Sequence, residues 1–377
     1  MNILIAPNAF KNSLDAQAVA EAIALGLQQS KVDCRYRLFP VGDGGDGTGE
    51  LLIKHLNGTN VQATVHDALG REITAAFGLI DNGHTAVIEM ADVSGLRLLK
   101  NIELNPMLAN SAGTGELIKA ALDEGVIKII IGMGGSATVD GGAGILSCLG
   151  VKFFDKAGRL LRPVPAELID LANIDTSSLD KRILSCEIII LCDVDNKLLG
   201  NEGAAAVFGP QKGATADDVI KLDVMLAKFA AIALQQTGKD MTTITHSGTA
   251  GGAAAGLFAF LNARLVSGAN YFLELTDFDV TLQNIDLVII GEGSIDEQTL
   301  HGKAPFAVAA MAKKRNIKVI GLAGKVPSEG SNTLKRYFDE LHSINKQQPT
   351  DLAIALKNTH DNLVRAAKEI GNRLSSA

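Results

Sequence analysis

The chain contains no tryptophan, and its other aromatic residues are 13 phenylalanines and 3 tyrosines. It also contains no basic tract, and its formal net charge is −7. Proteins that bind nucleic acid need positive charge for the phosphates, and many add aromatic side chains on which bases stack. Neither feature is present, so we do not expect nucleic acid as a partner.

Only four cysteines occur, and none forms a CxxC pair or has a histidine at metal-site spacing. Free thiols of this kind are typical of a reducing compartment. The N-terminus leads directly into an apolar strand, without the basic segment and long apolar stretch of a signal peptide. No apolar run is long enough to cross a bilayer. These absences predict a cytoplasmic protein that does not bind membranes.

Three common ligand-binding motifs are missing. No GxxxxGK[ST] sequence occurs, which excludes a P-loop protein. Residues 132–144 are glycine-rich and follow a strand, but no acidic residue stands at the distance that dinucleotide binding requires. No nucleophile elbow is present either, which argues against a hydrolase of that type.

Glycine, by contrast, is abundant, with 39 residues in a chain of 377. Much of it gathers in four stretches, 42–49, 132–144, 248–256 and 291–303. The composition is otherwise that of a folded protein, with 47% hydrophobic and 20% charged residues, and the length predicts two domains.

The two ends of the chain alternate short apolar strands with helices, which indicates a doubly wound parallel sheet. The middle differs, because residues 71–90 read as a hairpin around an Asn82-Gly83 turn. We therefore predict an α/β chain in which residues 1–66 and 286–377 form one domain. Residues 67–285 are expected to form an inserted α/β domain with a mixed sheet, and we expect the active site in the cleft between the two domains.

Polar residues follow several of the predicted strands, where ligands bind in open α/β sheets. Asp193 follows the strand 187–192, and Glu292, Asp296 and Lys303 follow the strand 286–290. Residues 132–138 offer backbone N–H groups and two hydroxyls, as in an anion-binding nest. Solvated loops and close helix–strand packing are the alternatives for these stretches. Carboxylates, lysines and glycine loops together favour phosphoryl transfer, in which a protein mainly positions reactants and neutralises charge.

A short repeat, GTGEL at 47–51 and 113–117, predicts two helix starts with Thr48 and Thr114 as N-caps. The alternative is that both helix N-termini direct N–H groups at a bound anion.

Seven motifs together resemble the bacterial type 1 glycerate kinase family. In chain order they are IAPNAFKNSL, PVGDGGDGTGELL, NSAGTGELIKAALDEG, IGMGGSATVDGGAG, CDVDNKLLG, FGPQKGA and IIGEGSIDEQTLHGKAP. The resemblance implies ATP-dependent phosphorylation of D-glycerate with Mg²⁺, and a flavodoxin-like domain interrupted by a second α/β domain. In the first motif, Asn8, Ala9 and Asn12 replace an Asp, a Ser and a Gly that the family commonly has.

On this basis we assign roles to individual residues. Asp193 is the first candidate for the general base, and Asp296 is its rival. Asp43 and Glu292 are candidates for Mg²⁺ binding. The residues expected to bind glycerate are Lys11, Ser13, Asp43 and Arg71. Those expected to face the nucleotide phosphates are Gly134, Gly135, Ser136, Thr138 and Lys303.

Two rival functions remain open on the sequence. One is a non-catalytic sensor that binds hydroxy acids, and the other is a Mg²⁺-dependent hydroxy-acid lyase that needs no nucleotide. The sequence does not decide which hydroxyl of glycerate is phosphorylated. It also leaves the oligomeric state open, with a homo-oligomer as one option.

Overall fold

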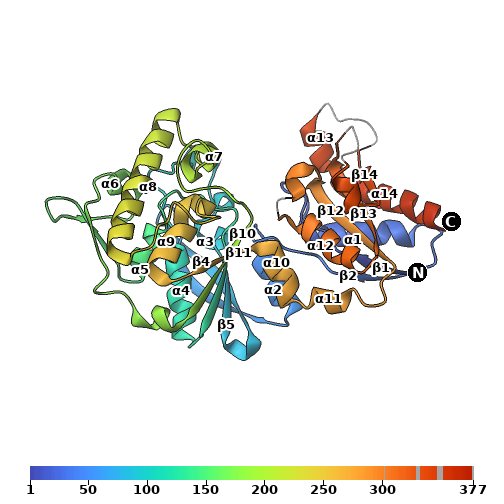
Figure 1. Ribbon diagram of the computed structural model, residues 1–377, viewed down its shortest axis with the longest axis horizontal. Coiled ribbons are helices and arrows are strands. Elements are labelled where there is room, and N and C mark those ends of the chain that lie inside the picture. The colour runs from blue at the N-terminus through green and yellow to red at the C-terminus, as the bar shows by residue number, and fades with distance from the viewer. Residues whose placement is uncertain (301, 328–331, 346–350, 376–377) are drawn as a thin grey trace. The chain divides into compact units, whose positions relative to one another are not determined.

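The computed structural model describes residues 1–300, 302–327, 332–345 and 351–375. The chain divides into two compact units (Figure 1). Unit 1 consists of Met1–Asp43 and Ala269–Ala377, and unit 2 consists of Gly44–Gly268. Unit 2 is therefore inserted into unit 1.

The chain passes from one unit to the other after residues 43 and 268, whereas the predicted domain boundaries lie after residues 66 and 285. Segment 44–66 belongs to unit 2, because its strand β3 (Thr59–His66) pairs antiparallel with β4 (Glu72–Ile80) along its whole length. Val61, Ala63 and Val65 alternate with polar residues in β3, as in a strand with one buried face, but the sequence analysis did not assign this segment to the inserted domain. Residues 269–285 belong to unit 1, where Phe278 packs edge-on against Phe39 with ring centroids 5.0 Å apart.

Unit 1 is built on a five-stranded sheet in the order β14-β13-β12-β1-β2, in which all neighbours are parallel. Counted in chain order within the unit, this order is 2-1-3-4-5 and reverses between β1 and β12. The strands are β1 (Asn2–Ile5), β2 (Arg35–Leu38), β12 (Leu287–Ser294), β13 (Lys318–Lys325) and β14 (Glu340–Ser343). The helices are α1 (Ala16–Gln28), α10 (Gly268–Leu275), α11 (Phe278–Thr281), α12 (Ala304–Lys314), α13 (Leu352–Lys357) and α14 (Thr359–Leu374).

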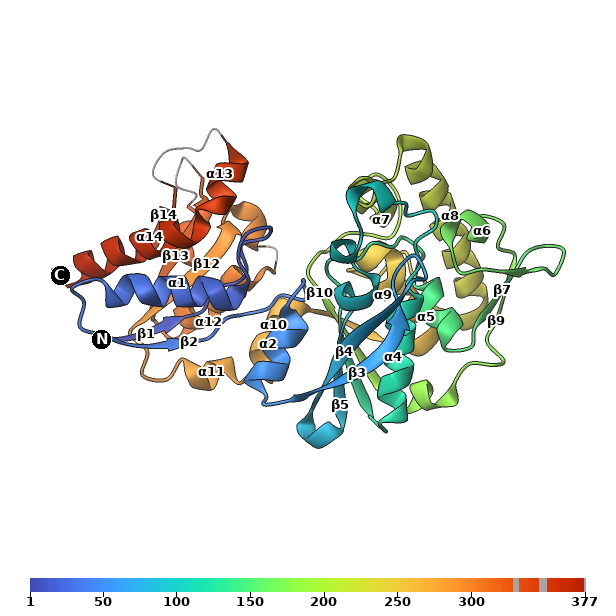
Figure 2. The same ribbon diagram turned by 180° about the vertical axis from the view of Figure 1, so that it is seen from behind.

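Helices cover both faces of this sheet, which explains why its central strands are continuously apolar. Ile3 and Ile5 point to the face covered by α1 and α14, which lie side by side in Figure 2. The other face is covered by α12, which packs on β12 and β13. α1 begins where the Asp15 carboxylate accepts a hydrogen bond from Ala18 N at 2.7 Å. Gly26 allows its close approach to α14, because a Cβ there would lie 2.3 Å from Val364 O.

Unit 2 contains a six-stranded mixed sheet in the order β11-β10-β6-β5-β4-β3. β4 and β5 form the predicted antiparallel hairpin, with Asn82 and Gly83 at positive φ in its turn. From β5 to β11 the neighbours are parallel. The remaining strands of this sheet are β5 (Thr85–Glu89), β6 (Lys128–Gly132), β10 (Glu187–Cys192) and β11 (Arg264–Ser267). A second, antiparallel sheet has the order β8-β7-β9, with β7 (Lys152–Phe154), β8 (Leu160–Leu161) and β9 (Asn173–Asp175).

One large apolar core holds unit 2 together and joins the six-stranded sheet to α4, α5, α8 and α9. Helix α8 is stabilised at both ends. A capping box of Thr215 and Asp218 begins it, and Gly238 at positive φ ends it. The helices of unit 2 are α2 (Thr48–His55), α3 (Ala91–Ser94), α4 (Ala112–Asp123), α5 (Ala143–Cys148), α6 (Pro165–Leu168), α7 (Ala204–Phe208), α8 (Ala216–Thr237) and α9 (Ala253–Leu261). The chain is thus a mixed α/β protein with one parallel and one mixed sheet.

Candidate functional site

In unit 1, buried polar side chains gather at the carboxyl ends of β1 and β2. Asn8 follows β1, and Asp43 follows β2. Asn8 Nδ2 donates a hydrogen bond to Asp43 Oδ2 at 2.8 Å, and both side chains are buried. Asn8 Oδ1 accepts from Ala9 N, which fixes the orientation of the amide. The Asp43 carboxylate is therefore held in place from one side.

Glu292, on β12, contributes a second buried carboxyl to the same edge of the sheet. Only 7% of the residue is exposed, and Oε2 has no hydrogen-bond partner among the described residues. Burial raises the pKa of Glu292 to about 8, with Lys303 and Lys11 acting to lower it and Asp43 and Asp296 to raise it. Four other charged residues predicted for the site are thus near enough to Glu292 to act on it within unit 1.

The turn after β1 carries Lys11 and Ser13. Asn12 adopts φ 65° in this turn, a conformation that glycine or asparagine accepts most readily. This explains how asparagine can occupy the position where the family commonly has glycine. Ser13 Oγ donates to Leu356 O at 2.6 Å, which ties the turn to α13. Lys11 is exposed.

The loop after β12 holds Asp296 and leads to Lys303. Asp296 N donates to Thr299 Oγ1 at 3.0 Å, and Ser294 Oγ donates to the Asp296 carboxylate at 3.3 Å. Lys303 is the N-cap residue of α12. Lys303 therefore lies in unit 1 with Glu292, whereas the glycine loop with which it was predicted to act lies in unit 2.

The glycine loop of unit 2 follows β6 directly. Gly134 N donates to Gly44 O at 3.1 Å, and a Cβ at Gly134 would lie 2.4 Å from Gly45 Cα. Gly135 adopts φ 70°, which strongly favours glycine. Two glycine-rich stretches that are distant in sequence, 42–49 and 132–144, therefore touch backbone to backbone.

Two buried side chains fix the rest of this loop. Lys212 Nζ donates to Ser136 Oγ at 2.8 Å and to Thr138 O at 2.7 Å. Asp140 is fully buried and accepts four hydrogen bonds, from Ser111 N, Ser111 Oγ, Gly142 N and Gly144 N. Sequence reasoning assigned neither residue to the site, because only the fold brings Lys212 to residues 136–138.

Asp193 follows β10 directly and is partly buried. Its loop is held by residues 246–248, since His246 Nδ1 lies 2.7 Å from Val194 O and Gly248 N donates to Asn196 O at 2.9 Å. Asp193 also acts electrostatically on Lys212, so the two belong to the same part of unit 2.

The two GTGEL segments do begin helices, but neither threonine is an N-cap. Gly47 is the N-cap of α2 and Ser111 that of α4. At α2, Gly49 N donates to Glu89 Oε1 at 3.0 Å, so the anion at this N-terminus is a carboxylate of the chain itself. Burial raises the pKa of Glu89 to about 7, against backbone hydrogen bonds that lower it. Sequence reasoning missed Glu89, which stands 40 residues along the chain from Gly49.

Arg71 lies in unit 2, in the turn between β3 and β4, and so is not grouped with Lys11 and Ser13 within unit 1. Its Nε donates to Asp67 Oδ2 at 2.6 Å, and its Nη1 donates to Glu103 Oε1 at 3.0 Å. These acids raise the pKa of Arg71. Its role in binding glycerate stays a prediction.

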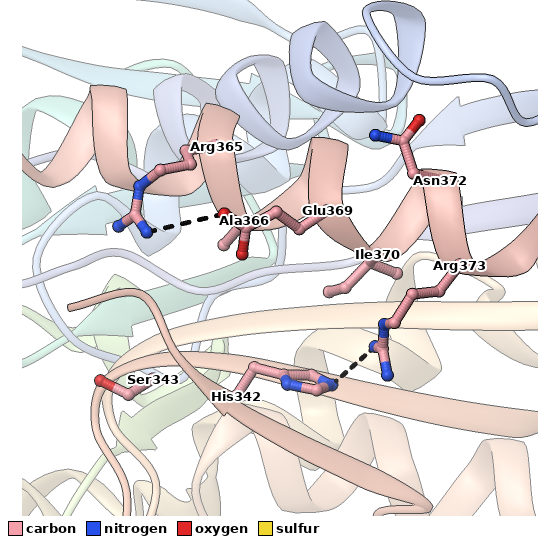
Figure 3. A pocket seen from close by; sticks show the side chains of 8 residues that line it. All are labelled: His342, Ser343, Arg365, Ala366, Glu369, Ile370, Asn372 and Arg373. Atoms are coloured by element: carbon pink, nitrogen blue, oxygen red, sulfur yellow. Dashed lines mark hydrogen bonds and ion pairs between the residues drawn. The ribbon is translucent and has the colours of Figure 1, made fainter. Parts of the chain in front are cut away.

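A surface pocket of about 410 Å³ lies between β14 and α14 of unit 1 (Figure 3). Its charged side chains pair with one another or with their neighbours. Arg373 Nη2 donates to Glu340 Oε2 at 2.7 Å and lies 3.1 Å from His342 Nε2, and Arg365 Nη2 donates to Ile344 O at 2.6 Å. None of the predicted site residues lines this pocket, which is therefore a different place from the two clusters described above.

Among the described residues, every helix is too short or too polar to cross a membrane. The described residues also contain no group of three or more His, Cys, Asp or Glu side chains that could hold a metal ion.

The fold and these strand-end clusters define an α/β protein with polar loops at the carboxyl ends of strands in both of its larger sheets. Residues 3–375 match the Glycerate kinase family, and the chain belongs to that family. It is 42% identical over 377 residues to a glycerate kinase of Bacillus subtilis (strain 168), covering 100% of this chain and 98% of the relative. It is 40% identical over 375 residues to a glycerate 2-kinase of Escherichia coli (strain K12), with coverage of 100% and 98%.

A crystal structure described as glycerate kinase 2 from Salmonella typhimurium LT2 is also similar. The two chains are 41% identical and superpose with a TM-score of 0.83, over 100% of this chain and 98% of the other.

Proposed function

We propose that the chain transfers the γ-phosphoryl group of ATP to a hydroxyl of D-glycerate. The observation that carries the proposal is the family match over residues 3–375. The buried carboxyls and nearby lysines of unit 1 suit a small hydroxy acid, and the glycine loop of unit 2 suits a phosphate chain. Cytoplasmic location is part of the same proposal.

We also propose that unit 1 is flavodoxin-like, which its strand order 2-1-3-4-5 supports. In such sheets, ligands bind beyond the carboxyl ends of the strands where the order reverses. Here the reversal lies between β1 and β12, the strands that lead to Asn8 and carry Glu292.

In the acceptor site, Lys11 would neutralise the carboxylate of glycerate, and Asp43 would accept a hydrogen bond from one of its hydroxyls. Ser13 Oγ already donates to Leu356 O, so it would act on glycerate as an acceptor. The orphaned Glu292 Oε2 and the Asp43 carboxylate fit Mg²⁺, which takes one or two carboxylates together with substrate phosphates. When bound, Mg²⁺ supplies neutralisation of phosphate charge.

In the transfer step, the acceptor hydroxyl oxygen forms a bond to the γ-phosphorus, and the bond from that phosphorus to the β,γ-bridging oxygen breaks. The hydroxyl proton passes to the carboxylate of Asp193, and ADP leaves with the bridging oxygen. The glycine loop, with Gly134, Gly135, Ser136 and Thr138, would hold the phosphate chain during this step.

Phosphorus NMR of a mixture of the protein, ATP, D-glycerate and Mg²⁺ tests the function. We expect ADP and a new phosphomonoester resonance, split as a doublet for the 2-phosphate or as a triplet for the 3-phosphate by the adjacent protons. Loss of glycerate without nucleotide would instead indicate a lyase. Binding of glycerate without turnover would indicate a sensor.

Replacement of Asp43 by alanine should raise the KM for glycerate by roughly tenfold or more, because a charge-assisted hydrogen bond to the substrate is lost. Steady-state kinetics at saturating ATP would measure this change. Asp33→Ala, at an exposed position of the same unit, is the matched control and should leave KM unchanged. An unchanged KM in a folded Asp43 variant would remove Asp43 from the acceptor site.

Replacement of Asp296 by asparagine should raise the Mg²⁺ concentration needed for half-maximal activity. Asp296 acts on Glu292 electrostatically, so its charge contributes to the field that would attract the cation. Titration of activity with Mg²⁺ measures the effect, and Glu297→Gln removes a neighbouring exposed charge as a control. Equal Mg²⁺ requirements in both variants would contradict this role.

A further inference from the structure

Lys212 is a buried lysine that the reaction described above does not use. It ends a short 3₁₀ turn, Pro210–Lys212, and only 3% of it is exposed. Its ammonium group has three protons to donate. Two go to Ser136 Oγ and Thr138 O, which are neutral oxygens, and among the described residues the third has no partner.

The charge of this lysine is also incompletely compensated. Within the described parts of the chain, no carboxylate forms an ion pair with Lys212, and Asp140 and Asp193 act on it only at longer range. The oxygens of Asp140 are already occupied by donors from Ser111, Gly142 and Gly144. A buried cation without an ion pair is costly to a folded protein, so its presence here points to an anionic ligand.

Thr138 supplies a second, independent observation. Its side chain is fully buried, and Oγ1 has no hydrogen-bond partner among the residues the structure describes. Buried hydroxyls without a partner are uncommon in native proteins. The carbonyl of the same residue accepts the hydrogen bond from Lys212 Nζ, in the glycine loop that follows β6.

We propose that Lys212 Nζ and Thr138 Oγ1 form an anion subsite in unit 2 that binds a phosphate group of a polyphosphate chain. The subsite rests on the proposed function, because it would hold the phosphates of the nucleotide. The ligand's oxygens accept the free proton of the ammonium group and that of the threonine hydroxyl. Lys212 thereby acts on the substrate directly and also positions residues 136–138.

Binding at this subsite should be coupled to a proton. In the free protein, burial lowers the pKa of Lys212 to about 7, while Asp140, before α5, and Asp193, after β10, act to raise it. A bound phosphate stabilises the ammonium form and raises this pKa. Between about pH 7 and the higher pKa of the complex, binding therefore takes up a proton, and affinity falls as the pH rises through this range.

Titration calorimetry of the full chain with inorganic tripolyphosphate tests the proposal. Lys212→Met should weaken binding by roughly 10- to 100-fold, and Thr138→Val by a smaller factor. Lys221→Met, at an exposed position of α8, removes the same charge from unit 2 and should bind normally. A folded Lys212→Met variant with unchanged affinity would overturn the proposal.

Proton uptake separates this role from a purely structural one. At pH 8.5, calorimetry in buffers of different ionisation enthalpy should show that the unmodified protein takes up a proton when tripolyphosphate binds. Absence of uptake would overturn the proposal even if Lys212→Met does not fold. If tripolyphosphate binds through Lys212 but D-glycerate is not phosphorylated, the proposed function fails and the subsite stands.

Discussion

Replacement of Asp193 by asparagine is expected to lower kcat for glycerate phosphorylation by roughly 10²- to 10⁴-fold, with a modest change in the KM for glycerate. An amide cannot accept the hydroxyl proton, but it keeps the shape of the side chain. A base must also be held near one hydroxyl, which favours a short and fixed attachment. Asp193 follows β10 directly, and contacts of His246 and Gly248 hold its loop.

Single-turnover and steady-state kinetics would measure this loss. Asp195→Asn is the matched control, because Asp195 lies in the same loop and its carboxylate is 3.1 Å from His246 Nδ1, but it is largely exposed. We expect it to change kcat by less than about tenfold, as it makes no proposed contact with the reacting hydroxyl. If excess Mg²⁺ restores the Asp193 variant but not Asp296→Asn, the roles of these two residues are exchanged.

Replacement of Asp140 by alanine should destabilise unit 2 by about 4 kcal/mol or more. The carboxylate accepts four hydrogen bonds in a fully buried place, from Ser111 N and Oγ at 2.8 and 2.7 Å and from Gly142 N and Gly144 N, both at 3.0 Å. Each buried donor left without an acceptor costs about 1–3 kcal/mol. This loss approaches the whole stability of many domains, about 5–15 kcal/mol.

Urea unfolding followed by circular dichroism would measure the change in the free energy of unfolding. Asp155→Ala is a suitable control, because Asp155 accepts from Ala157 N, Arg159 N and Arg159 Nε in a partly exposed turn. Water can replace that carboxylate, so we expect a loss of about 1 kcal/mol or less. Equal losses in the two variants would show that Asp140 does not anchor the glycine loop.

Substitution of the glycines in the same loop would be harder to interpret. A side chain at Gly134 would meet the backbone of Gly45, and one at Gly135 would be strained by the positive φ. A variant at either position therefore changes the folded structure as well as any phosphate contact. Thr138→Val separates these effects better, because it removes a hydroxyl that has no hydrogen-bond partner among the described residues and leaves the size of the side chain nearly unchanged.

The sequence was sufficient for those features that depend on local pattern. Continuous apolar runs at 187–192 and 286–290 predicted the buried parallel strands β10 and β12. The Asn82-Gly83 pair predicted the turn of the β4–β5 hairpin, because it requires residues that accept positive φ. The family motifs also predicted the candidate residues, most of which lie in loops that follow strands.

Three other features depend on the tertiary structure, because they join segments that are distant in the chain. The pattern of β3 does not reveal its pairing with β4, so the domain boundary was predicted at 66 rather than at 43. The pattern around Arg71 does not reveal that its Nη1 donates a hydrogen bond to Glu103, which stands 32 residues further along the chain. Neither the contact of Glu89, on β5, with Gly49 N of α2 nor the contact of Asp140 with Ser111 has a local signal in the sequence.

The sequence by itself determined the family, the alternation of strands and helices, and the residue types offered to a ligand. Only the tertiary structure decided which of these residues are buried and what they contact. Lys212 shows the physical reason, since its hydrogen bond to Ser136 spans 76 residues of chain. The pKa and charge compensation of a side chain depend on everything packed around it, and no local pattern of residues specifies that surrounding.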